Sequence, residues 1–256
     1  MTRIIAVSSG KGGVGKTTFT ANMALALNYY NQKVVIVDCN VTTPHLANYL
    51  GVTDHQFTLN DVLKGKVSIT DAIQNYNGIV YIPASEELKD LEKINILNLK
   101  HHVRKLFFPG LIDFVFLDSA PGLGREALAV LEAANEVIFI TTPSLQNLVD
   151  VRRVMTVAGN LKHKKFSVVL NMVNMGSKEY EIEEAQKFLG IPLTGVIPWD
   201  VSVADSFSLG KPVLNYKPKS LASQYFLKIA ELMTAEHQKE EGILSRLRNR
   251  FFGKNS

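Results

Sequence analysis

The sequence predicts an α/β fold built on a doubly wound, mainly parallel sheet with helices on both faces. Short runs of β-branched and aliphatic residues recur along the chain, and most are apolar without a break, which is typical of strands buried on both faces. Segments of helical character separate several of these runs, as in successive βαβ units. Loops follow the carboxyl ends of the runs, where open α/β sheets bind their ligands.

The predicted elements continue as far as residue 236, and no internal repeat or Pro/Gly-rich linker interrupts them before the polar stretch 237–242. With 256 residues, of which 46% are hydrophobic and 20% charged, the chain can bury one substantial core. The expected strands are 4–7, 34–37, 79–82, 114–117, 137–141, 166–170 and 193–197. The expected helices include 17–28, 124–134 and 150–161, and the candidate site loops are 8–15, 39–44, 119–124 and 142–145.

Positive charge is concentrated at the end of the chain. The formal net charge is +4, and the last fifteen residues contain Arg246, Arg248, Arg250 and Lys254 without any acidic residue. The rest of the chain is therefore neutral overall, which disfavours a generally basic nucleic-acid-binding surface. A basic tail with an anionic partner is expected instead.

Cysteine usage and the N-terminus favour a cytoplasmic protein. Cys39 is the only cysteine, so one chain can form neither an intrachain disulfide nor a multi-cysteine metal site. The N-terminal residues enter an apolar strand directly, without the apolar region of a signal peptide, and no apolar stretch approaches the length of a membrane span.

A phosphate-binding loop follows the first predicted strand. Residues 10–17 match G-x-x-x-x-G-K-[ST] and open a helical segment, which is the context that this motif requires. The glycines let backbone N–H groups surround phosphate oxygens, Lys16 supplies a charge, and Thr17 offers a hydroxyl to Mg²⁺. The residues expected to bind ATP here are Gly10, Lys11, Gly12, Gly13, Val14, Gly15, Lys16, Thr17 and Thr18.

The form KGGVGKTT, with a second lysine, resembles the deviant Walker-A family of MinD, ParA and Soj. The resemblance implies an ATP-dependent homodimer in which Lys11 reaches the ATP of the partner subunit. It also implies that Lys11 and Lys16 are both catalytic residues. Taken alone, Lys11 would be an ordinary solvated lysine.

Two further segments fit this resemblance. The apolar run 114–117 ends in Asp118, a carboxylate that can hold Mg²⁺ or merely cap the strand, and the next residues resemble the family's second switch, in which the N–H of Gly122 would face the γ-phosphate. The first switch, usually D-x-D, reads Asp38-Cys-Asn40. Asn40 can orient water but cannot accept a proton, so ATP hydrolysis is expected to be slow. The expected metal partners are Thr17, Asp38 and Asp118, and Asp38 and Asn40 are the expected catalytic residues of this switch.

The resemblance also assigns the base and ribose to the segments at Asn171, Pro198 and Asp200. Asp150 matches a family aspartate near the signature lysine, and an ordinary acid at a helix start explains it almost as well. Without the resemblance, Asn171 would be a turn residue at a strand end.

The C-terminal segment predicts an amphipathic helix. At about 100° per residue the large apolar side chains of 243–251 fall within one sector, with arginines at its edges, which resembles the membrane-targeting helix of MinD. Burying each apolar side chain yields roughly 1.5–3 kcal/mol, whereas ordering each residue costs about 1–2 kcal/mol. One tail should therefore bind an anionic membrane only marginally. Two tails joined in a dimer should bind it roughly 10²- to 10⁴-fold more tightly. The expected membrane contacts are Ile243, Leu244, Leu247, Phe251 and Phe252, with Arg246, Arg248 and Arg250.

Together these features predict an ATPase domain at 1–236 and a polar linker with a membrane-targeting tail at 237–256. The resemblance implies an enzyme that binds ATP and Mg²⁺, dimerises, binds the inner face of the cell membrane reversibly and positions a division or polar structure, under an unknown activator or effector. A partition ATPase that binds DNA non-specifically is the main alternative. An iron–sulfur carrier, which needs paired cysteines, and a small-molecule synthetase rank lower.

Overall fold

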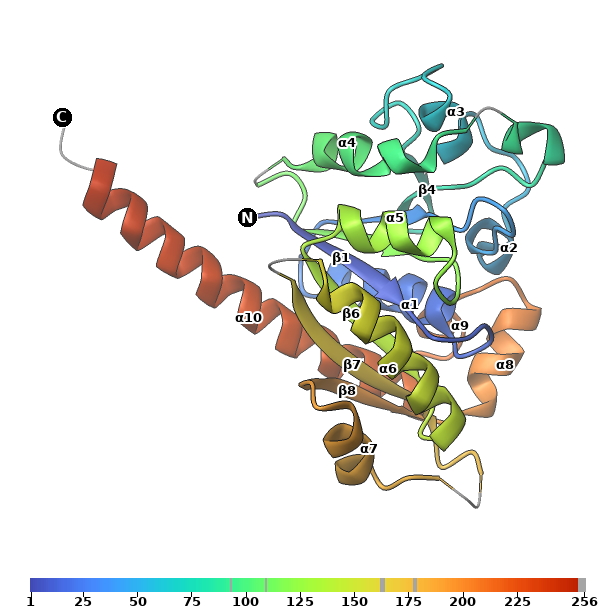
Figure 1. The fold of residues 1–256 in the computed structure, drawn as a ribbon, viewed down its shortest axis with the longest axis vertical. Coiled ribbons are helices and arrows are strands. Elements are labelled where there is room, and N and C mark those ends of the chain that lie inside the picture. The colour runs from blue at the N-terminus through green and yellow to red at the C-terminus, as the bar shows by residue number, and fades with distance from the viewer. Residues whose placement is uncertain (93, 109, 162–163, 177–178, 253–256) are drawn as a thin grey trace.

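The structure, a computed structural model, describes residues 1–92, 94–108, 110–161, 164–176 and 179–252; for 243–252 it describes the course of the helix and not the side chains. Its centre is an eight-stranded sheet in the order β3-β4-β2-β5-β1-β6-β7-β8 (Figure 1). The strands are β1 (Arg3–Ser8), β2 (Val34–Asp38), β3 (Gln74–Tyr76), β4 (Ile79–Ile82), β5 (Phe114–Asp118), β6 (Glu136–Thr141), β7 (Lys165–Val173) and β8 (Leu193–Pro198).

All neighbouring strands are parallel except β3, which pairs antiparallel with β4 at the edge. The predicted fold class and the seven predicted strands are confirmed. Strand β3 was missed because its residues, Gln-Asn-Tyr, are polar and largely exposed, so that the sequence carries no buried apolar run there.

Helices cover both faces of the sheet, and two apolar cores result. Alternate residues of β1 divide between them: Ile4 and Ala6 face one core, and Ile5 and Val7 face the other. The first core packs against α3 (Leu59–Leu63), α4 (Leu99–Val103), α5 (Arg125–Ala133), α6 (Leu145–Gly159) and α7 (Ile182–Leu189). The second packs against α1 (Lys16–Tyr29), α2 (Leu46–Leu50), α8 (Val201–Ser208), α9 (Val213–Tyr216) and α10 (Leu221–Phe252).

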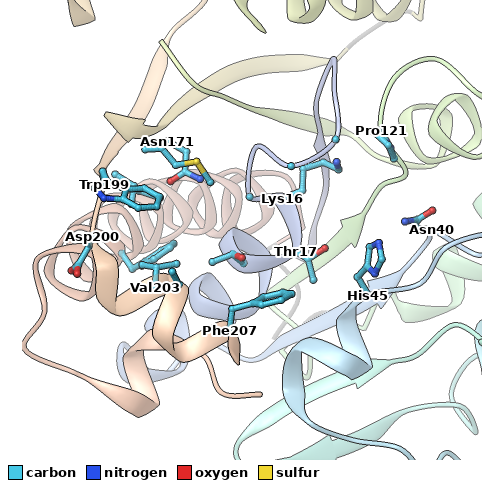
Figure 2. Close-up of a pocket in the computed structure, with 18 of the residues that line it drawn as sticks. Lys16, Thr17, Asn40, His45, Pro121, Asn171, Trp199, Asp200, Val203 and Phe207 are labelled. Carbon is cyan, nitrogen blue, oxygen red and sulfur yellow. The ribbon is translucent and has the colours of Figure 1, made fainter. Parts of the chain in front are cut away.

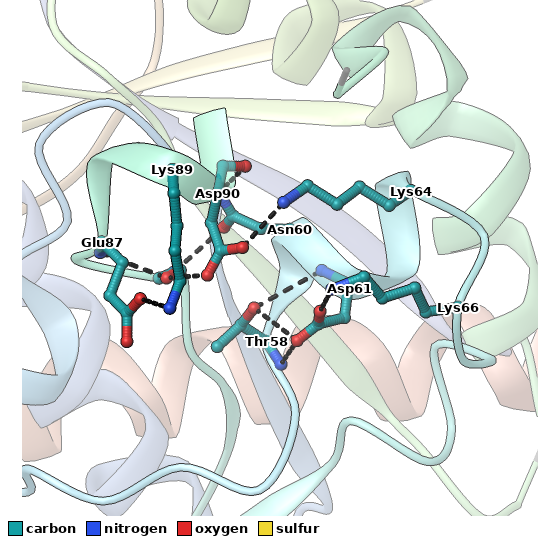
Figure 3. A network of polar contacts seen from close by, with 9 residues as sticks. Thr58, Asn60, Asp61, Lys64, Lys66, Glu87, Lys89 and Asp90 are labelled. Atoms are coloured by element: carbon teal, nitrogen blue, oxygen red, sulfur yellow. Dashed lines mark hydrogen bonds and ion pairs between the residues drawn. The ribbon is translucent and has the colours of Figure 1, made fainter. Parts of the chain in front are cut away.

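A polar network ties together the part of the chain that connects β2 to β5. It joins α3 to the short helix η1 (Leu88–Leu91), and Asp90 is its centre (Figure 3). The Asp90 carboxylate accepts hydrogen bonds from Lys64 Nζ at 2.7 Å and from Ser85 Oγ at 2.8 Å. Two further 3₁₀ helices, η2 (Ile96–Asn98) and η3 (Arg104–Leu106), flank α4.

Helix α10 packs on α1 and β8 and then projects beyond the body of the molecule (Figure 1). The segment 237–242, expected to be a linker, is helical, and this part of the prediction was wrong. Its polar side chains bind the amino-terminal edge of the sheet: Glu240 pairs with Lys165, Glu241 with the amino group of Met1, and His237 is almost fully buried. Whether 237–256 behaves as a separate unit stays a prediction.

Candidate nucleotide-binding site

A cavity of about 650 Å³ opens at the carboxyl edge of the sheet (Figure 2). Its walls are the loop before α1, the loop between β2 and α2, the loop after β5, the end of β7 and helix α8. The predicted site residues that line it are Gly12, Gly13, Gly15, Lys16, Thr17, Thr18, Asn40, Asn171, Pro198 and Asp200.

The phosphate loop requires glycine at Gly15. This residue has φ +92°, and an added Cβ would lie 2.3 Å from Nδ2 of Asn171. Lys16 follows it at the first position of α1, only 8% exposed, and its Nζ donates to Ser9 Oγ at 2.9 Å. Burial lowers the pKa of Lys16, although the charge of Asp118 opposes this. The loop thus presents a cationic, partly desolvated end of α1 to the cavity.

Other predicted residues of this loop lie outside the lining. Val14 is buried beneath the loop, and the Lys11 side chain is exposed. Gly10 packs so closely on Asp150 that an added Cβ would lie 2.4 Å from its carbonyl carbon. The prediction that a helix begins at Asp150 was wrong, because α6 begins at Leu145 and its first turn already contributes a buried leucine to the core.

Asp38 and Asp118 lie beneath the cavity as register partners at the ends of β2 and β5, and both are almost fully buried. Asp38 accepts backbone N–H groups from Asn40 and Leu46, each at 3.1 Å. Burial raises the pKa of both carboxyls, and for Asp38 the neighbouring Asp118 raises it further.

The Oδ1 oxygen of Asp118 is buried and has no hydrogen-bond partner among the described residues. The same carboxyl group interacts with the Thr17 side chain. An orphaned carboxylate oxygen beside a hydroxyl suits a hard cation with oxygen ligands. Thr17 and Asp118 would therefore hold Mg²⁺, with Asp38 behind them, and the ion would neutralise charge on the phosphates.

The two switch segments make internal hydrogen bonds. The Asn40 amide donates to the carbonyl of Thr43, and its oxygen accepts from Thr43 Oγ1 at 3.2 Å. The N–H of Gly122 donates to the carbonyl of Ser9 at 3.0 Å. The predicted contact of Gly122 with the γ-phosphate and the catalytic role of Asn40 stay predictions.

The far end of the cavity is suited to a base. Asn171 Nδ2 donates to the Val14 carbonyl at 2.8 Å, which fixes the amide relative to the phosphate loop. Trp199 and Phe207 add aromatic surface to the wall. Asp200 lines the cavity too, but its two oxygens cap helices, accepting from the N–H groups of Ser202 and Ala222 at 2.8 and 3.0 Å.

Several lining residues were not named as site residues by the sequence prediction. Trp199 lies inside the predicted segment 198–200, Phe207 follows that segment on α8, and His45 comes directly after the predicted loop 39–44. Their position within or beside predicted segments was the available signal. Phe226 of α10 lines the cavity from a distant part of the sequence, and no local pattern indicates this contact.

The predicted membrane-binding side chains are outside what the structure describes, although the helix backbone continues to Phe252. In the described part of the chain no helix is long and apolar enough to cross a membrane. The side chains concerned are Ile243, Leu244, Arg246, Leu247, Arg248, Arg250, Phe251 and Phe252.

Comparison with known proteins agrees with this site. A family model described as ParA, NUBPL iron-transfer P-loop NTPase, matches residues 1–234. An uncharacterized ATP-binding protein of Methanocaldococcus jannaschii is 30% identical over 98% of this chain and 97% of its own length. The septum site-determining protein MinD of Synechocystis sp. is 28% identical over 99% of this chain and 100% of its own length.

Solved structures give the same assignment. The septum site-determining protein MinD of Pyrococcus horikoshii, complexed with Mg-ADP, has a TM-score of 0.86 and 33% identity, covering 91% of this chain and 96% of its own. The cell division ATPase MinD of Pyrococcus furiosus has a TM-score of 0.86 and 31% identity, covering 92% and 99%. The predicted use of ATP and Mg²⁺ is confirmed at this level, and the chain belongs to the ParA/MinD family of P-loop ATPases.

Proposed function

We propose that this ATPase positions a division or polar structure by binding membrane as an ATP-bound dimer and leaving it after hydrolysis. The observation that carries the proposal is the continuity of α10. Phe226 lines the nucleotide cavity and packs on Phe19 of the phosphate-loop helix, with ring centroids 6.3 Å apart. The same helix continues to Phe252, beyond the body (Figure 1). The amphipathic sequence thus lies on the helix that contacts the nucleotide site.

The exposure of Lys11 supports the dimer. Its side chain is exposed, and it does not line the cavity of its own chain, whereas Lys16 does. A second subunit placed over the cavity would give the dimer two tails. Because two linked weak sites bind roughly 10²- to 10⁴-fold more tightly than one, dimerisation alone would control whether the protein stays on the membrane.

The relatives support the cellular role. Those named septum site-determining protein MinD match over most of this chain, and a MinC:MinD cell division protein complex of Aquifex aeolicus has a TM-score of 0.79 at 25% identity. For this chain we propose a comparable protein effector and an activator of hydrolysis, at the inner face of the cell membrane.

Iron transfer, which the family description mentions, is disfavoured by Cys39. This sole cysteine is 0% exposed, so it cannot meet its counterpart in a second subunit without rearrangement of the β2 end. A cluster bound between two subunits would need more accessible thiolates. DNA partition is disfavoured by the neutral body of the chain.

The test is co-sedimentation with vesicles containing anionic lipid, in Mg-ATP and in Mg-ADP, with DNA binding measured in parallel. The intact chain should pellet in ATP and much less in ADP, and a chain ending at Glu241 should stay in solution in both. Failure of the intact chain to bind vesicles, together with ATP-dependent DNA binding, would replace this proposal by partition.

A further inference from the structure

His45 is a cavity residue to which the family resemblance gave no role. It precedes α2 as its N-cap residue and lines the same cavity as Thr17 and Asn40. Figure 2 shows the base end, with Asn171 and Trp199, on one side of Lys16 and Thr17, and His45 on the other. The imidazole therefore lies at the phosphate end of the cavity.

The backbone of His45 is fixed while its ring is not. Its N–H bonds to the buried carboxylate of Asp38, and its carbonyl accepts the N–H of Tyr49 at 2.9 Å. The side chain makes no cap hydrogen bond to α2, is exposed to the cavity, and has no hydrogen bond to any other described residue. The backbone thus keeps the imidazole beside the cavity, and both ring nitrogens are available for hydrogen bonding.

Other polar groups at this end are already engaged. Both ends of the Asn40 amide bond to Thr43, and Asp38 accepts the backbone N–H groups of Asn40, His45 and Leu46. The orphan oxygen of Asp118 is the expected metal ligand. Hydrolysis of ATP nevertheless needs a group that orients the attacking water, since phosphoryl transfer depends mainly on positioning and charge stabilisation.

We propose that His45 is a catalytic residue that orients the attacking water, with one imidazole nitrogen accepting a hydrogen bond from it. The water oxygen bonds to the γ-phosphorus, and the bond from that phosphorus to the β–γ bridging oxygen breaks with its electron pair remaining on ADP. Both water protons end on inorganic phosphate. The proposal rests on ATP hydrolysis at this cavity and is independent of membrane binding.

Four variants separate the ring's hydrogen bond from its bulk. His45→Ala removes both, His45→Phe keeps an aromatic ring without nitrogen, and His45→Asn and His45→Gln keep a hydrogen-bond acceptor. His101→Ala, an exposed histidine on α4, is the matched control. Because the His45 side chain does not cap α2, none of these changes removes a hydrogen bond on which the fold depends.

Single-turnover hydrolysis and binding of a non-hydrolysable ATP analogue are measured for each variant. His45→Ala and His45→Phe should slow hydrolysis about 10²-fold with analogue affinity nearly unchanged; His45→Asn or His45→Gln should recover part of the rate, and His101→Ala should match wild type. Equal losses of rate and affinity, or an unchanged rate in His45→Ala, would overturn the proposal.

A second readout does not depend on activity. The imidazole ¹⁵N signals of His45, assigned by their loss in His45→Asn, should shift when Mg²⁺ and the non-hydrolysable analogue are added and should respond differently to Mg-ADP. Identical signals with both nucleotides would place the ring away from the γ-phosphate and contradict the assigned role. If His45→Ala hydrolyses ATP slowly but binds vesicles normally, the role of His45 in hydrolysis is supported independently of membrane binding.

Discussion

Asp38 and Asp118 lie next to each other as register partners on β2 and β5, and they are 1% and 2% exposed. Burial raises the pKa of both carboxyls, and the charge of Asp118 raises the pKa of Asp38 further. The arrangement is therefore unfavourable to the nucleotide-free fold and becomes favourable when a cation binds. If Mg²⁺ binds here as proposed, the nucleotide-free fold gives up stability for that site.

The first prediction concerns Asp118→Asn. Removing one carboxyl should stabilise the nucleotide-free chain at pH 8, by roughly 1–3 kcal/mol, because Asp38 can then ionise without a like charge beside it. The same change should abolish the Mg²⁺ dependence of ATP binding. Thermal unfolding with and without Mg-ATP tests both effects, and a destabilised variant that still responds to Mg²⁺ would contradict the repulsion inferred for this pair.

The second prediction concerns base selection by Asn171. Its Nδ2 is committed to the Val14 carbonyl, so the remaining amide oxygen is an acceptor available to the cavity. The adenine amino group can donate to it, and the guanine carbonyl cannot. Asn171→Ala should therefore lower ATP affinity about tenfold and narrow the preference for ATP over GTP, whereas Asn160→Ala at the end of α6 should change neither. Competition binding of the two nucleotides is the measurement; an unchanged ATP:GTP ratio in Asn171→Ala would exclude this role.

The third prediction concerns pH and the network of Figure 3. Hydrogen bonds from Lys64 and Ser85 lower the pKa of Asp90. Its contribution to the free energy of unfolding is therefore fully present above the unfolded pKa of about 3.9 and is lost as pH falls through the lower folded pKa. Asp90→Asn should cost about 1–2 kcal/mol at pH 7, and the difference from wild type should shrink at pH 3.

The matched control for that experiment is Glu87→Gln in the same network. The Glu87 and Lys89 side chains are 60% and 75% exposed, so this ion pair should contribute little. Denaturant unfolding at pH 7 and pH 3 separates the two carboxylates. If both variants lost the same free energy of unfolding, general surface charge rather than the part-buried hydrogen bonds of Asp90 would set the effect.

The fourth prediction concerns the packing of α10 on β8. An added Cβ at Gly195 would lie 2.4 Å from Ile229 Cγ1. Gly195→Ala should therefore destabilise the chain by about 1–3 kcal/mol, and in the Ile229→Ala background the same change should cost much less. Gly159→Ala, where an added Cβ meets nothing within 4 Å, is the control. Additive losses at 195 and 229 in denaturant unfolding would argue against direct contact.

Local patterns predicted most of the sheet and the phosphate loop, because a buried parallel strand is a continuous apolar run and the phosphate loop has a fixed order of residue types. These patterns failed where tertiary contacts determine the local structure. Strand β3 is too short and polar to stand out, and it forms because β4 offers it an edge. Polar residues at 237–242 indicated a linker, yet this segment is helical, and its Glu240 and Glu241 pair with Lys165 and the N-terminus, both distant in sequence.

The candidate site shows the same division. Lys16, Thr17 and Asp118 belong to short motifs whose spacing is set by the chemistry of phosphate and Mg²⁺, so the sequence alone located them. The contribution of Phe226 depends on how a C-terminal helix crosses α1, which no local pattern encodes. The availability of the His45 ring depends on the hydrogen bonds that occupy its neighbours, and these are visible only in the folded chain.

If ATP controls membrane binding by pairing two tails, ATP must control the oligomeric state of the chain. Analytical sedimentation measures that state in Mg-ATP and in Mg-ADP for wild type, Lys11→Ala and Lys16→Ala. Wild type should form a dimer only in ATP, Lys11→Ala should bind ATP and remain a monomer, and Lys16→Ala should lose both ATP binding and the dimer. A wild-type chain that binds ATP and remains monomeric at every concentration tested would contradict nucleotide control of paired tails.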